Sequence, residues 1–285
     1  MLRGSAKSVL IAVLLAAAPA ARAEDALSYL EGLKGSDQRF RAPSEIDKRY
    51  TIALYVNTAT EGPWRQRMWV LQRGAIGGEW RLAMWDEDHW RKADLGDGAA
   101  PSYSWPVSTG RYYRGDRFSG PTPTGVFALD ERKWRYGRGY TAPGMTHTMY
   151  IDFHYEGGRR SGVAFHGTTT GRYRRLGTND SHGCIRMKKK NALALLDRIT
   201  GRDRVLPEPL RWGEVPRFWT SERGQTRLGY TRDGSPHPVD ALAQVDTGEA
   251  DAGAEPAAAP ADFAQSSEGV LMKTGFRAIA VIFAN

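Results

Sequence analysis

Alternating and continuous apolar runs fill most of the chain from residue 50 onward, and they predict β-strands. The runs are rich in β-branched and aromatic residues, and Gly- or Pro-containing turns separate them, as at 61–63 and 77–78. The predicted strands cover residues 50–59, 67–74, 79–88, 124–130, 147–155 and 162–167. This pattern indicates a mostly β fold.

One segment, 191–201, instead has its apolar residues at helical spacing. Asn191 is placed to cap its start, and Gly201 is placed to end it. The face expected to be buried consists of Ala192, Leu195, Leu196 and Ile199. The sequence therefore predicts one or two short helices in a β-rich protein.

The first 23 residues have the pattern of an export signal. Arg3 and Lys7 precede an apolar run of about 11 residues, and Ala21-Arg22-Ala23 has the small-x-small pattern of a cleavage site. The run is too short for a bilayer, which needs roughly 20 apolar residues. We expect a mature chain that starts near Glu24, has no transmembrane segment, and lies in the periplasm or cell envelope.

Charge is unevenly spread along the chain. The formal net charge is +8, of which residues 246–285 contribute −4, so the body of the chain is strongly basic. A basic, Arg- and Trp-rich protein outside the cytoplasm suggests an anionic partner. That compartment argues against nucleic acid and leaves cell-wall polymer or a membrane surface.

Two short basic segments resemble each other: "GRYYRGD" at 110–116 and "GRYRRLG" at 171–177. Two copies do not make a solenoid repeat. The similarity is either a chance product of an Arg-, Gly- and Tyr-rich chain or a sign that both loops frame one anionic pocket.

Cys184 is the only cysteine of the chain, within "NDSHGCIRM". An unpaired thiol in an exported protein is a buried small hydrophobe, an intermolecular link or a reactive group. His182 precedes Cys184 by two residues, and His166 ends an apolar strand 18 residues earlier. A histidine within reach makes a thiol nucleophilic, and the amides of Gly183 and Cys184 could bind an oxyanion. These residue types predict an acyl-transfer site.

A zinc site of His166, His182 and Cys184 is an alternative reading of the same residues. Its H-x-C spacing is unusual, and neither H-E-x-x-H nor C-x-x-C accompanies it.

The segment "HGTTTGRYRRLGTNDSHGCIRM" (166–187) resembles the signature of the YkuD-like L,D-transpeptidases. "PVSTGRYY" (106–113) and "PTPTGVFAL" (121–129) resemble the paired segments that precede it in that family. The resemblance implies a YkuD-like β-sandwich catalytic domain over 48–200. Around it we expect a signal peptide (1–23), an N-terminal lead-in (24–47), a C-terminal extension (201–245), a disordered acidic Ala/Pro linker (246–268) and a short apolar tail (269–285) that docks as a strand.

The resemblance also implies roles for the site residues. Cys184 would be the nucleophile and His166 the base, with the carbonyl of Gly167 orienting the imidazole. His182 and Ser181 would line the site. For substrate contacts we expect Arg186, Thr168 in the Thr-rich loop, and Trp134 in a loop at the rim.

Cys184 would attack a peptidoglycan stem tetrapeptide, release D-alanine and form a thioester that an amine resolves. The reaction needs no metal, cofactor or ATP. The acceptor would be a second stem peptide or a wall-attached lipoprotein. Three alternatives stay open: an L,D-carboxypeptidase or hydrolase that uses the same thioester, a non-catalytic wall-binding protein, and a zinc hydrolase.

Overall fold

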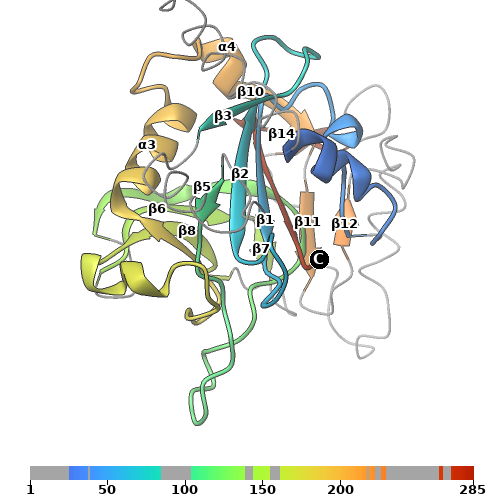
Figure 1. The fold of residues 1–285 in the computed structure, drawn as a ribbon. Coiled ribbons are helices and arrows are strands. Elements are labelled where there is room, and N and C mark those ends of the chain that lie inside the picture. Colours follow the sequence, from blue (N-terminus) through green and yellow to red (C-terminus); the bar gives the residue numbers. More distant parts are fainter. Residues whose placement is uncertain are drawn as a thin grey trace, which may run out of the picture.

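The computed structural model describes residues 26–37, 39–84, 104–138, 144–154, 161–216, 218–221, 226–228, 263–265 and 271–285. Strands dominate these residues, with few short helices, so the predicted mostly β class is confirmed (Figure 1). The predicted signal peptide, and all of the predicted linker except 263–265, lie outside them.

The strands, in chain order, are β1 (Ile52–Asn57), β2 (Arg67–Gln72), β3 (Arg81–Met84), β4 (Trp105–Pro106), β5 (Gly125–Arg138), β6 (Thr146–Ile151), β7 (Phe153–His154), β8 (Ala164–Thr168), β9 (Ile185–Lys188), β10 (Trp212–Pro216), β11 (Phe218–Ser221), β12 (Thr226–Leu228), β13 (Phe263–Gln265), β14 (Leu271–Phe276) and β15 (Ala278–Phe283). The helices are α3 (Lys189–Thr200), α4 (Glu208–Arg211) and the 3₁₀ turns η1 (Pro43–Glu45) and η3 (Thr170–Arg175), and residues 26–32 are also helical.

One large mixed sheet organises the described residues. Its order is β3-β2-β1-β15-β5-β6-β8-β9, with β4 paired to β2. Two three-stranded sheets accompany it, β10-β14-β13 and β12-β11-β7. The strand expected in the C-terminal tail is present as β15, and it lies between β1 and β5 rather than at an edge.

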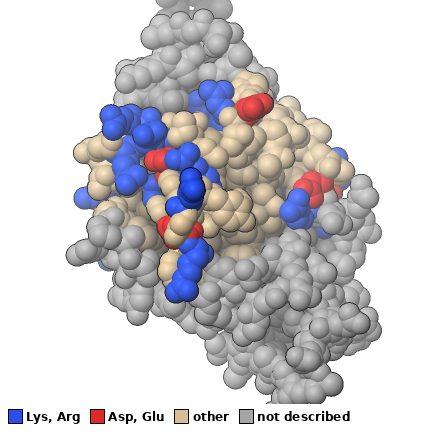
Figure 2. All heavy atoms as spheres, turned by 90° about the horizontal axis from the view of Figure 1, so that it is seen from below, with Lys and Arg blue, Asp and Glu red and all other residues tan. Residues whose placement is uncertain are grey.

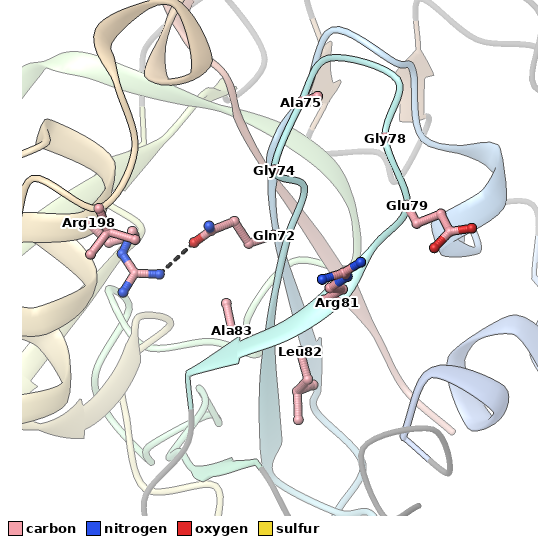
Figure 3. Close-up of a pocket in the computed structure, with 10 residues that line it drawn as sticks. Gln72, Gly74, Ala75, Gly78, Glu79, Arg81, Leu82, Ala83 and Arg198 are labelled. Carbon is pink, nitrogen blue, oxygen red and sulfur yellow. Dashed lines mark hydrogen bonds between the residues drawn. The ribbon is translucent and has the colours of Figure 1, made fainter. Parts of the chain in front are cut away.

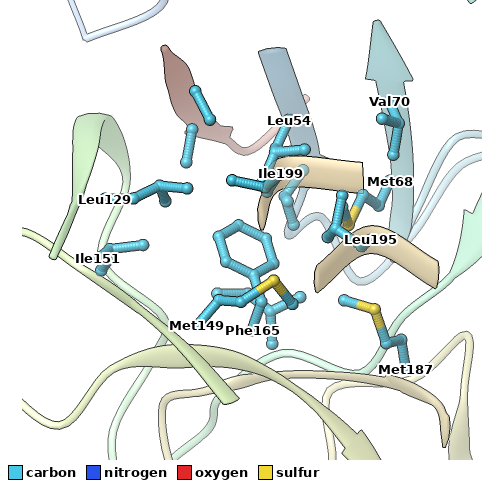
Figure 4. Packing of buried hydrophobic residues seen from close by; sticks show 14 of the residues in the cluster. Leu54, Met68, Val70, Leu129, Met149, Ile151, Phe165, Met187, Leu195 and Ile199 are labelled. Atoms are coloured by element: carbon cyan, nitrogen blue, oxygen red, sulfur yellow. The ribbon is translucent and has the colours of Figure 1, made fainter. Parts of the chain in front are cut away.

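The large sheet is buried on both faces at its centre. Along β1, Leu54 faces a core that also contains Leu195 and Ile199 of α3, whereas Tyr55 faces a second core built with residues from 26–46 (Figure 4). Figure 1 shows α3 on one side of the sheet and the N-terminal segment, in blue, on the other. Central strands with two buried faces become continuous apolar runs, as "IALYV" of β1 does.

The predicted helix is confirmed except for its start. It spans Lys189–Thr200, so Asn191 is not the N-cap but a buried residue of the first turn, and Lys188 occupies the cap position. The helix starts early because β9 leads into it without a loop. At the other end Gly201 adopts φ 79°, the left-handed geometry expected of a helix stop.

Two further expectations need correction. Trp134 does not lie in a loop, because β5 continues to Arg138, well beyond the predicted strand. The four-residue strand β9 was missed, since it is too short for its alternation to stand out between a loop and a helix. Among the described residues no helix is long and apolar enough to cross a membrane.

Candidate active site

The pairing of β8 with β9 brings the backbones of His166 and Cys184 close together. The two strands are parallel neighbours, with Phe165 opposite Ile185 and His166 opposite Arg186. Phe165 and Ile185 belong to the core beside α3. Because successive side chains alternate along β8, His166 points to the face opposite Phe165. Cys184 directly precedes β9 and therefore lies beside the strand that carries His166. The pairing of base and nucleophile predicted from sequence therefore has a geometric basis.

His166 is held as a neutral base. Its imidazole is almost fully buried, and Nδ1 donates to the carbonyl oxygen of Gly167 at 2.9 Å, the orienting contact that the resemblance implied. Burial lowers the pKa of His166 to about 4; the bond to Gly167 acts against this, and the nearby charge of Arg186 lowers the pKa further. At neutral pH the ring is therefore unprotonated, with Nε2 as the nitrogen that can accept a proton.

The surroundings of Cys184 favour the protonated form of its thiol. Burial raises the pKa of the thiol above its usual range, while a backbone hydrogen bond from Ala164 and the charge of Arg186 act in the opposite direction. The thiol also donates to the carbonyl oxygen of Gly162 at 3.4 Å. A protonated thiol near a neutral imidazole requires the imidazole to remove the proton as the thiol attacks.

Ser181 fastens the turn that carries the nucleophile. Its hydroxyl donates to the Cys184 carbonyl oxygen at 2.5 Å and accepts the amide of Gly183 at 3.1 Å. Gly183 has φ +136°, which L side chains rarely adopt. Since the Gly183 amide already has an acceptor, it is less available as an oxyanion donor than the sequence suggested, and the Cys184 amide is the better candidate.

The segments that precede the signature pack directly against this turn. A Cβ on Gly110 would lie 2.5 Å from the Gly183 Cα and 2.2 Å from the Gly120 carbonyl oxygen, so only glycine fits. Thr122 joins the two backbones: its hydroxyl accepts from the Gly110 amide and donates to the Gly183 carbonyl, both at 2.8 Å. These two residues position the nucleophile. Both lie in the quoted motifs, but sequence alone gave them no role.

Asp180 connects the two similar basic loops. Its side chain accepts a hydrogen bond from the Tyr113 hydroxyl at 3.0 Å and lies 3.5 Å from the guanidinium groups of Arg111 and Arg172. The loops at 110–116 and 171–177 are therefore neighbours; whether they frame an anionic pocket stays a prediction. Sequence analysis missed Asp180, although it directly precedes the Ser-His-Gly-Cys signature.

Arg186 braces the site loop from the sheet. Its Nη1 donates to the carbonyl oxygen of Asp180, and burial lowers the pKa of the guanidinium. Of the two roles expected for Arg186, bracing is the one with a visible contact.

His182 faces the neighbouring loop. Its Nε2 lies 3.1 Å from Asp116 Oδ2, its ring stacks on Tyr113 at a centroid distance of 4.5 Å, and about half of its side chain is exposed. These contacts suit a residue that lines the site better than one that acts as its base.

The remaining predicted site residues, Thr168, Gly167 and Trp134, lie in different surroundings. Thr168 is buried at the end of β8, two residues beyond His166 on the same face. Gly167 is tightly enclosed, because a Cβ there would lie 2.6 Å from the Thr146 hydroxyl. The backbone of Trp134 lies in β5, and its side chain is outside the described part of the structure.

The geometry gives no support to a zinc centre in the described region, since no three His, Cys, Asp or Glu side chains there are grouped to hold a metal ion.

A cavity of ≈ 600 Å³ lies away from these residues, between the β2–β3 turn and the C-terminal half of α3. Arg198 of α3 donates to Gln72 of β2 across it (Figure 3). None of the predicted site residues lines it.

Comparison with known proteins agrees with this site. Residues 89–206 match the family model of YkuD, described as an L,D-transpeptidase catalytic domain. This part of the chain, less than half of its length, is similar to that family, and it contains every residue assigned to the site. No curated protein is similar enough in sequence to count as a relative.

Solved structures similar to the chain include several L,D-transpeptidases. One, from Mycobacterium smegmatis, is 20% identical with a TM-score of 0.27, covering 52% of this chain and 54% of its own. Another, from Mycobacterium tuberculosis H37Rv, is 17% identical with a TM-score of 0.29, covering 52% and 53%. A third, L,D-transpeptidase 3 from Mycobacterium tuberculosis, is 18% identical with a TM-score of 0.27, covering 50% and 55%. The chain thus spans about half the length of the structures it matches.

Proposed function

We propose that the protein is a cysteine L,D-transpeptidase acting on peptidoglycan stem peptides. The observation that carries the proposal is the pairing of β8 with β9: Cys184, directly before β9, lies beside the strand of His166, whose Nδ1 is held by the Gly167 carbonyl. That arrangement supplies a nucleophile and a neutral base, which is what covalent acyl transfer requires.

In the proposed first step, Nε2 of His166 takes the thiol proton while Sγ of Cys184 attacks the carbonyl carbon of the third stem residue. The Cys184 amide donates to the resulting oxyanion. The intermediate then collapses: the C–N bond to the terminal D-alanine breaks, His166 returns the proton to the departing amine, and a thioester remains.

In the second step an amine attacks the thioester carbonyl carbon and His166 takes its proton. The C–S bond then breaks, and His166 returns the proton to the departing sulfur. A diamino acid side chain of a second stem would give a 3→3 cross-link, and an amine on a wall-attached lipoprotein would give protein attachment. Water in place of the amine would make the protein an L,D-carboxypeptidase.

We place this reaction outside the cytoplasm, in the periplasm or cell envelope. The signal-like pattern of residues 1–23 supports the placement. The intact mass of protein recovered from the envelope fraction tests it, since a chain that begins near Glu24 is expected.

The test of function is incubation with a disaccharide-tetrapeptide, followed by mass spectrometry. A cross-linked dimer that has lost one alanine is expected from the wild type, and tripeptide alone would establish the hydrolytic alternative. Cys184→Ala should abolish both products and leave the thermal unfolding midpoint nearly unchanged. His166→Ala should lower kcat/KM about 10²–10⁴-fold, the usual contribution of a general base.

The non-catalytic alternative makes the opposite prediction, because wall binding would persist in Cys184→Ala and no product would form with the wild type. His182→Ala is the matched control for His166→Ala. It should have the smaller effect, and equal losses in both variants would contradict the assignment of His166 as the base.

A further inference from the structure

The segment between β4 and β5 forms a projecting finger, which we define as residues 111–119. In Figure 1 this green segment extends beyond the body of the molecule. Its tip is fixed by local hydrogen bonds: the Asp116 amide donates to the Tyr113 carbonyl at 3.0 Å, and the Tyr113 amide donates to the Ser119 hydroxyl at 2.7 Å. Gly115 makes the turn with φ +80°. The finger is therefore a shaped surface feature.

The finger exposes two large aromatic side chains. Tyr112 is 77% exposed and Phe118 is 78% exposed, the highest values among the exposed large hydrophobic residues of the described chain. Single exposed apolar residues are common, but two on one projecting turn are not explained by packing within the chain. Phe118 has no polar atom to hydrate, so its exposure favours a partner with an apolar layer.

Arginines surround these rings. Arg114 and Arg117 are exposed on the finger, and Arg117 lies over the Phe118 ring at 4.8 Å. The neighbouring turn η3 adds Arg174 and Arg175, also exposed. Figure 2 views the end of the molecule from which the finger projects, and Lys and Arg side chains gather there with few Asp or Glu among them. Asp116, the one acidic residue of the finger, faces His182.

We infer that the finger, with η3 beside it, docks the protein on an anionic membrane surface. Arginine guanidinium groups attract acidic lipid headgroups, and aromatic side chains enter the layer between headgroups and acyl chains. The projecting shape favours a membrane over a soluble anionic polymer, because a polymer is held best by a groove that surrounds it. This inference does not depend on the proposed reaction, although Tyr113 stacking on His182 would place the site near the membrane.

The experiment is sedimentation of residues 24–285 with vesicles, since residues 1–23 are apolar and would bind lipid themselves. Binding to vesicles of phosphatidylglycerol and phosphatidylcholine should exceed binding to pure phosphatidylcholine at least tenfold. It should also weaken as salt rises, because the attraction is screened. The double variant Tyr112→Ser with Phe118→Ser should lower the partition coefficient about tenfold. The double variant Arg114→Gln with Arg117→Gln should lower it by a similar factor or more, because each cation contributes roughly fivefold.

Matched controls carry the same chemical changes elsewhere. Ile76→Ser with Val205→Ser removes two exposed apolar side chains, and Arg202→Gln with Arg204→Gln removes two exposed cations just after α3. Both controls should bind vesicles within about twofold of the unsubstituted chain.

Three results would overturn the inference. The first is equal binding to neutral vesicles, and the second is equal losses in the controls and the finger variants. The third is that the serine double variant binds anionic vesicles as well as the parent protein does, and that polyphosphate displaces both proteins from the vesicles. That result would make the surface a site for soluble polyanions instead. Circular dichroism of each variant shows whether the fold is retained, and the arginine pair provides a second reading should the serine pair misfold.

Discussion

The centre of the sheet and the site loops are stabilised in opposite ways. β1 and β15 pair in the middle of the sheet and bury apolar side chains on both faces. The loops around Cys184 contribute little apolar surface; hydroxyl-to-backbone bonds from Ser181 and Thr122 and the close contact of Gly110 with Gly183 hold them. The sheet centre should therefore determine whether the protein folds, and the loops should determine whether the thiol is correctly placed.

The largest expected effect comes from removing the central strand. Deletion of residues 277–285 separates β1 from β5 and exposes both cores. We expect complete loss of the cooperative unfolding transition, measured by circular dichroism and near-UV absorption. Deletion of Asn285 alone, which lies beyond the strand and is exposed, is the control and should unfold cooperatively. A folded 1–276 variant would show that the comparison overstates the role of the sheet centre.

A smaller effect on folding, but a large one on activity, is expected from Gly110→Ala. The new Cβ would collide with the Gly120 carbonyl and the Gly183 backbone, which must move away and carry Cys184 with them. We expect a loss of about 100-fold in kcat/KM, as for misplacements of about 1 Å in other enzymes. Gly171→Ala is the matched control, because nothing lies within 4 Å of its added Cβ. Equal activities in the two variants would contradict the positioning role.

The pH dependence of kcat/KM tests the burial of His166 without any substitution. The pKa of His166 is lowered to about 4, so the base stays neutral from pH 7 down to about 5 and loses function only as pH falls through 4. An ordinary imidazole, with a pKa near 6.5, would cost about 30-fold in kcat/KM by pH 5. We expect less than a twofold change between pH 7 and 5, measured where circular dichroism shows a folded chain. A midpoint near 6.5 would mean that His166 is not buried in solution.

The smallest effect should come from Asp116→Asn. The change removes the charge that faces His182, a half-exposed pair of a kind worth about 0.2–1 kcal/mol. We expect kcat/KM to fall up to about fivefold with no change in unfolding midpoint. Asp203→Asn, which removes a surface carboxylate paired with Arg198, should leave kcat/KM unchanged.

Local sequence patterns predicted where strands and helices lie better than they predicted which strands pair. The apolar runs located β1, β2, β6 and β8, because a buried strand needs several apolar residues close together in the sequence. The position of β15 beside β1 was not predictable, since it pairs residues 52–57 with residues 278–283 and no short-range pattern encodes that. The extension of β5 was missed because "ERKWRYGR" is polar and lacks the alternation of a half-buried strand.

The site shows the same division. Cys184 and His166 could be named because their chemistry is rare and their spacing is informative. Gly110 and Thr122 contact Gly183, 73 and 61 positions away, and the Asp180 carboxylate accepts from Tyr113, 67 positions away. No local pattern encodes contacts between such distant residues. Residues that position a nucleophile look like ordinary loop residues until the chain is folded.

The order of the strands has a consequence for biosynthesis. β15 occupies the centre of the large sheet, yet it follows every other strand of that sheet along the chain. A ribosome releases the chain from its N-terminus, so β1 and β5 must wait for residues 278–283 before they can be joined. Contacts between such distant segments form slowly. The nascent chain therefore cannot complete this sheet until residue 283 has left the ribosome, and β1 and β5 lack their shared neighbour for nearly the whole of synthesis.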